Sequence, residues 1–181
     1  MKRMIVAAIV FLSAPVIAQN VTNQIDIIGL IPGVSSAAQF KAASIPTPDY
    51  RAYRGDSSTF QAFEIGGFTL GCHGEFEGDK MQKFSCTTGY AESNIDIHNV
   101  LKRGFQEKLG SPFSDTSSTV RNGLGTEFNV NEVMWADKLG NVLLLKSMDD
   151  KIDKGSLTLF SSSLVKKVQE SNAQQDRARK F

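Results

Sequence analysis

Residues 68–90 read FTLGCHGEFEGDKMQKFSCTTGY, and they decide the fold because they predict a β-hairpin closed by the two cysteines of the chain. A single register places Cys72 opposite Cys86 and Glu75 opposite Lys83, with side chains alternating between the two faces of both strands. Opposed positions of a non-hydrogen-bonded pair have the Cβ separation that a disulfide requires. The sequence therefore predicts a Cys72–Cys86 disulfide. A structural role is favoured over the alternative of a redox-active pair, because the chain has no Cys-x-x-Cys motif.

The turn of this hairpin is predicted at Gly78 and Asp79, residue types that suit the backbone of a short loop. Carried to the turn without interruption, the register places Phe76 opposite Gln82. Every pair in the hairpin then follows from one alignment.

The first eighteen residues, MKRMIVAAIVFLSAPVIA, have the three parts of a signal peptide. Lys2 and Arg3 form a basic start, an apolar run follows, and small residues precede a cleavage site after Ala18. The run is too short to span a bilayer, and no cysteine follows the site to carry a lipid. We expect a periplasmic or secreted protein that begins at Gln19 and has no stable membrane anchor. An exported protein with an even number of cysteines also agrees with a disulfide.

The charge balance argues against one class of partner. The mature chain would keep 18 of the 20 basic residues and all 19 acidic residues, which gives a net charge of −1. Such a balance does not predict a nucleic-acid binder. The length suits one domain with one core. We expect a single domain over residues 19–171, followed by a frayed, charged tail over residues 172–181.

A second hairpin is predicted around residue 139. Its register places Glu132 opposite Lys146 and Trp135 opposite Leu143, so it again combines a charge pair with apolar pairs. Residues 142–145 are apolar on both faces, which indicates a central strand.

Helices are predicted on either side of the first hairpin and at the end of the chain. Residues 94–109 repeat apolar side chains at helical spacing, and a shorter helix begins near Ser35. Residues 24–31 read as a short strand, and residues 111–125, rich in Ser, Thr and Gly, as a loop. The fold class is α+β: a twisted antiparallel sheet of two hairpins plus flanking strands, with two to three helices packed on one face.

Gly33-Val34-Ser35 opens the first predicted helix, and Leu109-Gly110-Ser111-Pro112 ends the second. These motifs resemble β-lactamase-inhibitor-protein-like domains, small periplasmic α+β proteins in which a helix of this kind precedes a strand meander. In that family the Leu-Gly-x-Pro ending belongs to the first helix, where this chain has Ile45-Pro46 instead. The resemblance implies a periplasmic binding or inhibitor module and leaves the partner unspecified.

Metal-like spacing occurs once in the chain. His73, Glu75 and Glu77 share one strand face, and imidazole and carboxylates suit zinc and related metals. The favoured alternative is a solvated face on which Glu75 pairs with Lys83. The other histidine, His98, is predicted on the exposed side of its helix. No cofactor is predicted, because the sequence has neither a Gly-x-Ser-x-Gly elbow nor a phosphate-binding loop.

A candidate interface is the cluster Tyr50, Arg51, Tyr53 and Arg54, residue types enriched at protein interfaces. The alternative is a loop whose tyrosines pack on the body of the protein. Trp135 is predicted to be a core residue.

Three functions follow from these observations. A non-enzymatic binding or adaptor module for an envelope protein is favoured. The alternatives are a small hydrolase, metal-dependent or built on His73 or His98 with a carboxylate, and a carrier of an apolar ligand held between sheet and helices. The partner and the oligomeric state stay open.

Overall fold

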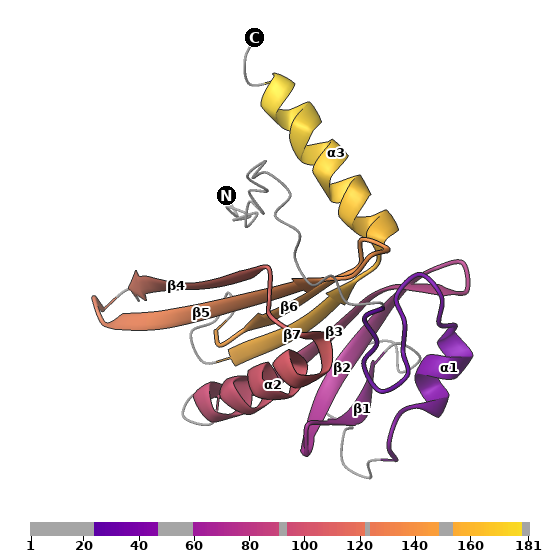
Figure 1. Ribbon diagram of the computed structural model, residues 1–181, viewed down its shortest axis with the longest axis horizontal. Helices are drawn as coiled ribbons and strands as arrows, with labels where there is room; N and C mark the ends of the chain where they lie inside the picture. Colours follow the sequence, from indigo (N-terminus) through magenta and orange to yellow (C-terminus); the bar gives the residue numbers. More distant parts are fainter. Residues whose placement is uncertain (1–23, 47–59, 91–93, 122–123, 149–153, 179–181) are drawn as a thin grey trace.

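The computed structural model describes residues 24–46, 60–90, 94–121, 124–148 and 154–178 (Figure 1). These residues form three helices and seven strands, in the order α1 (Ala37–Ala42), β1 (Phe60–Ile65), β2 (Phe68–Glu77), β3 (Lys80–Tyr90), α2 (Asn94–Leu109), β4 (Ser114–Arg121), β5 (Glu127–Ala136), β6 (Val142–Lys146), β7 (Lys154–Phe160) and α3 (Ser162–Ala178). The strands form one antiparallel sheet in the order β1-β2-β3-β7-β6-β5-β4. This confirms the α+β fold class.

The first hairpin has the predicted register over most of its length, with Cys72 opposite Cys86 and Glu75 opposite Lys83. Next to the turn the register shifts, and Phe76 lies opposite Met81. The predicted pairing of Phe76 with Gln82 is therefore wrong.

The cause of this shift is a tertiary contact of Met81. Its side chain is fully buried, and its backbone exchanges hydrogen bonds with the segment before α1: Gly33 N–H donates to the Met81 carbonyl oxygen (2.6 Å), and Met81 N–H donates to the Ser35 carbonyl oxygen (2.8 Å). A β-bulge lets one strand residue turn toward such a contact. Gln82 is thereby freed for contacts with the chain around α3.

The second hairpin is confirmed in full, with Glu132 opposite Lys146 and Trp135 opposite Leu143. Residues 142–145 are buried, and β6 lies between β7 and β5. An apolar run without alternation therefore marked a strand inside the sheet, as its pattern predicted.

Two segments have a secondary structure different from the one that the sequence predicts. Residues 114–121, predicted within a loop, form β4, the strand at one edge of the sheet. Both of its faces are largely exposed, so its sequence has no apolar alternation to reveal it. Residues 24–31 form no extended strand. Ile28 and Gly29 have positive φ and make a tight turn, bridged by Ile27 and Leu30.

The core lies between one face of the sheet and the two helices that cover it, α1 and α2 (Figure 1). Phe40 of α1 packs edge-on against Phe63 and Phe84 of the sheet, with ring centroids 5.0 and 6.0 Å apart. Under α2, Phe105 packs on Trp135 at 5.8 Å. Trp135 is 1% exposed, which confirms it as a core residue.

The last helix differs from the other two, because α3 projects away from the sheet beyond the end of β7 (Figure 1). The sequence predicts fraying beyond Ser171, but the helix continues to Ala178. No glycine or proline follows Gly155, so nothing in the local sequence interrupts a helix here. Within the described residues, no helix has the length and apolar character needed to cross a membrane.

Candidate interaction surface

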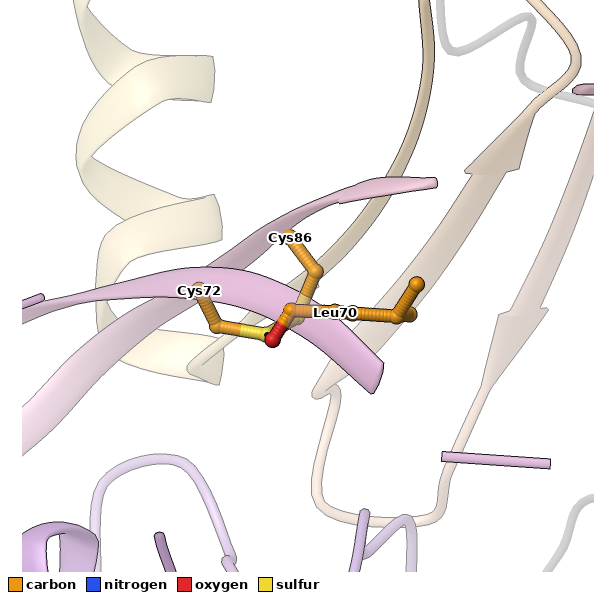
Figure 2. The surroundings of a disulfide bond; sticks show 3 residues. All are labelled: Leu70, Cys72 and Cys86. Atoms are coloured by element: carbon orange, nitrogen blue, oxygen red, sulfur yellow. A yellow bond between two sulfur atoms is a disulfide. The ribbon is translucent and has the colours of Figure 1, made fainter. Parts of the chain in front are cut away.

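The disulfide that the sequence predicts is formed, and it lies inside the protein. Cys72 and Cys86 are bonded to each other, with their Cα atoms 4.0 Å apart. Their side chains are 0% and 3% exposed, and the Leu70 carbonyl oxygen lies 3.7 Å from the Cys72 sulfur (Figure 2). An attacking thiolate has to reach a sulfur atom, and this one is screened from solvent. The geometry favours the structural role.

The candidate metal patch is divided between two ion pairs. Glu75 bonds Lys83 at 2.7 Å, and Glu77 bonds Lys167 of α3 at 2.7 Å. His73 is exposed beside them. Among the described residues, no group of three or more histidine, cysteine or acidic side chains could hold a metal ion. The carboxylates of this face therefore serve to join strands and to fasten α3.

His98 occupies the inner face of α2, and the prediction of an exposed position is wrong. It is 1% exposed and shares that face with Leu101 and Phe105, which lie three and seven residues later. The sequence pattern places the apolar stripe of the helix on Ile97, Leu101 and Phe105 and leaves the polar residue next to Ile97 outside it. Neither ring nitrogen of His98 has a hydrogen-bond partner.

Burial lowers the pKa of His98 below its ordinary value, because it disfavours the charged imidazolium. The nearby polar side chain of Asn99 raises the pKa, the charge of Lys102 lowers it, and the carboxylate of Asp115 raises it. Asp115 is already paired with Lys102 at 2.6 Å. His98 is therefore a neutral residue of the core, and the neighbouring carboxylate of Asp115 forms an ion pair with Lys102.

The Tyr/Arg cluster of Tyr50, Arg51, Tyr53 and Arg54 lies outside the described residues. Its role as an interface stays a prediction.

A surface that sequence reasoning missed is α3, which is built on a hydrogen-bonded root at the end of β7. Ser161 begins the helix: its Oγ accepts from Leu164 N–H at 3.2 Å, which satisfies one of the free donors of the first turn. Asn141 Oδ1 accepts from Ser162 N–H at 2.9 Å. The root thereby joins α3 to the turn between β5 and β6.

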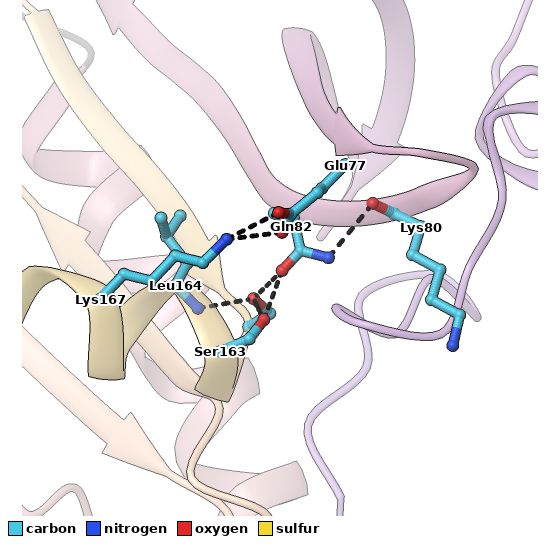
Figure 3. A network of polar contacts seen from close by, with 7 residues as sticks. Glu77, Lys80, Gln82, Ser163, Leu164 and Lys167 are labelled. Carbon is cyan, nitrogen blue, oxygen red and sulfur yellow. Dashed lines mark hydrogen bonds and ion pairs between the residues drawn. The ribbon is translucent and has the colours of Figure 1, made fainter.

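Gln82, released by the bulge in β3, ties the same root to the first hairpin. Its Oε1 accepts hydrogen bonds from the hydroxyls of Ser161 and Ser163 (Figure 3). One turn further along, Lys167 Nζ donates to both carboxylate oxygens of Glu77, at 2.7 and 2.8 Å. These contacts fix the direction in which α3 leaves the body.

Beyond Lys167 the helix is open to solvent. Residues 169–171 and 173–176 are exposed, and Val168 is 39% exposed. Leu164, Val168 and Gln175 lie along one stripe of the helix, because they are four and seven residues apart. This stripe is apolar near the root of the helix, at Leu164 and Val168, and polar further out, at Gln175. The sequence does carry a signal for this surface, because the predicted helix has few apolar side chains after Val168.

No protein-family model, curated protein or solved structure matches the chain.

Proposed function

We propose that this protein is an exported, non-enzymatic binding or adaptor module whose partner, a protein of the cell envelope, docks on α3. The observation that carries the proposal is a 17-residue helix that is fastened at its root and exposed along its outer turns. Most of the stability of helices in proteins comes from tertiary packing of one face and not from intrinsic helix propensity. An apolar groove on a partner would supply that packing to the stripe of Leu164, Val168 and Gln175.

The residues that the alternative functions would use are buried or paired with other side chains. A hydrolase would need a histidine close to a free carboxylate, yet His98 is enclosed in the core and Glu75 and Glu77 are each paired with a lysine. A carrier would need space between sheet and helices. Phe40 instead fills the region beneath α1 by contact with the rings of Phe63 and Phe84.

Export is the second part of the proposal. The signal-peptide pattern of residues 1–18 supports it, and a buried disulfide suits an oxidising compartment. The resemblance of residues 33–35 to β-lactamase-inhibitor-protein-like domains points the same way. Mass spectrometry of the protein recovered from the envelope fraction should give a chain that begins at Gln19; an unprocessed chain in the cytoplasm would contradict export.

The docking surface can be tested in the producing cells by placing a photo-crosslinking amino acid at Gln175, which is exposed on the outer part of the stripe. Light should then yield one discrete adduct of the protein with its partner. Val168→Glu should abolish the adduct, because it puts a charge at the centre of the docking stripe.

Ile95→Glu is the matched control. Ile95 is an apolar residue of similar exposure, 48% against 39% for Val168, and it lies in the first turn of α2, where a carboxylate is favourable. We expect its adduct to be unchanged. If Gln175 yields no adduct, or if Val168→Glu and Ile95→Glu reduce the adduct equally, α3 is not the docking surface.

A further inference from the structure

The two edges of the sheet differ in how they are protected. At one edge, another segment of the same chain pairs with β1 at one point, where Ile45 N–H donates to the Ala62 carbonyl oxygen at 2.9 Å. At the other edge, β4 pairs with β5 over eight successive residues without a bulge, and its residues 115–121 are exposed. Proteins usually shield such an edge with proline, a bulge or a covering segment. β4 has none of these among the described residues.

The backbone groups that point out from this edge can be identified from the other side of β5. Asp137 N–H donates to the Asn141 carbonyl oxygen and Ser147 N–H to the Asn131 carbonyl oxygen, both in register between β5 and β6. The odd-numbered residues of β5 therefore direct their peptide groups toward β6, and the even-numbered residues direct theirs toward β4.

The pairing of β4 with β5 joins even to even, for example Ser118 to Val130. The odd-numbered residues of β4 consequently direct their N–H and C=O groups away from the sheet. These residues are Asp115, Ser117, Thr119 and Arg121. Their free donors and acceptors form a template for one more strand.

We propose that a second copy of this chain fills this edge, through antiparallel pairing of β4 with β4 of the other copy about a two-fold axis at Ser118. The strand is complementary to itself in this register. Ser117 faces Thr119 of the second copy, Thr116 faces Val120, and Asp115 faces Arg121, each pair occurring twice by symmetry. The outward peptide groups of the four odd-numbered residues then make roughly eight backbone hydrogen bonds across the axis.

Charge selects this register over its neighbours. Asp115 is paired within its own chain with Lys102, and Arg121 with Glu127. When Asp115 lies opposite Arg121 of the second copy, these ion pairs join into a row of Lys102, Asp115, Arg121 and Glu127, in which the charges alternate in sign. The two-fold axis makes two such rows. A shift of two residues leaves both charges without an opposite partner, and a shift of one residue brings inward-pointing peptide groups to the axis.

This dimer goes beyond the proposed function and uses a different surface, because neither β4 nor β5 contributes to the docking stripe of α3. Edge pairing alone buries less area than a standard protein interface. We therefore expect a reversible dimer that weakens as the salt concentration rises.

The test of the register is Ser118→Cys in the mature, disulfide-bonded protein, whose two native cysteines are already paired. At the two-fold axis the new cysteine faces its own copy at a non-hydrogen-bonded position, which is a geometry that a disulfide spans. Mild oxidation should convert most of the protein to a covalent dimer. Thr116→Cys is the control: it lies on the same face of the same exposed strand, but its copy is four residues away along the partner strand, roughly 13 Å distant.

The reversible dimer is tested separately by light scattering during size-exclusion chromatography. Ser117→Pro removes an outward N–H, so it should convert the dimer to monomer without loss of a bond between β4 and β5. Equal crosslinking of Ser118→Cys and Thr116→Cys would overturn the proposal, as would a wild-type protein that stays monomeric at the highest attainable concentration. If Ser118→Cys is recovered from cells bonded to a different protein, a foreign strand occupies this edge and the second copy does not.

Discussion

Reduction of the Cys72–Cys86 disulfide should destabilise the protein by about 3 kcal/mol. The two cysteines are 14 residues apart, so the bond closes a loop of about 15 residues in the unfolded chain. Opening that loop returns conformational entropy to the unfolded state, which costs about 3 kcal/mol of folding free energy at 25 °C. For a domain of this size, that loss lowers the melting temperature by roughly 6–12 °C.

The alanine variant separates loop closure from packing. Both cysteines are buried, so Cys72→Ala/Cys86→Ala opens the loop and also empties two sites in the core. Each emptied site should add about 1 kcal/mol, giving a total of about 5 kcal/mol, whereas the reduced wild-type protein keeps both sulfur atoms and loses about 3 kcal/mol.

Urea unfolding followed by the fluorescence of Trp135 measures both values, because this buried residue is the one tryptophan of the chain. The reductant should not shift the unfolding midpoint of the alanine variant, which controls for effects unrelated to the disulfide. The reasoning is refuted if the wild-type protein, with both thiols shown to be free, unfolds at the same urea concentration before and after reduction.

Three further predictions follow from the packing of single residues. Because burial lowers the folded-state pKa of His98, the unfolded state binds a proton at higher pH than the folded state does, and the free energy of unfolding should fall as the pH drops below about 6.5. Urea unfolding at several pH values should show a weaker dependence of this free energy on pH for His98→Leu than for the wild-type protein. Phe40→Ala should cost about 3–5 kcal/mol of unfolding free energy in urea, since this fully buried ring anchors α1. Gly155→Ala should destabilise the protein by about 2 kcal/mol or more, because the added Cβ would lie 2.3 Å from the hydroxyl of Thr88. Gly104→Ala is the comparison: nothing lies within 4 Å of its Cβ, so about 1 kcal/mol of added helix stability should raise the melting temperature. Equal melting temperatures for these two variants would contradict the packing argument.

Local patterns in the sequence were sufficient wherever neighbours in space are neighbours in the chain. The cysteine hairpin could be aligned because a short turn fixes which residues face each other, and because Cys72–Cys86 and Glu75–Lys83 both demand the same register. α2 could be recognised because its apolar residues recur at helical spacing over four turns. The signal-peptide pattern is also local, and export stays a prediction from it.

Errors arose where a distant segment of the chain decides the local conformation. The bulge at Phe76 depends on hydrogen bonds from the segment before α1, and the sequence of the hairpin carries no trace of them. The burial of His98 depends on where the sheet lies beneath α2, since a polar residue at the border of an apolar stripe is ambiguous in a helical pattern alone.

What the sequence determined by itself was therefore the class of the fold, its two hairpins, its disulfide and its main helix, because short-range periodicity and pairing define them. The tertiary structure alone decided the surfaces through which this protein can act. Ser114–Arg121 is a strand only because β5 offers it hydrogen bonds. The direction of α3 is set by Gln82 of β3, the strand beside β7 in the sheet, and by Glu77 of β2, the strand next to β3, and both residues are far from α3 in the chain. Polar, exposed elements have no apolar pattern of their own, so their position is set by the partners that hold them.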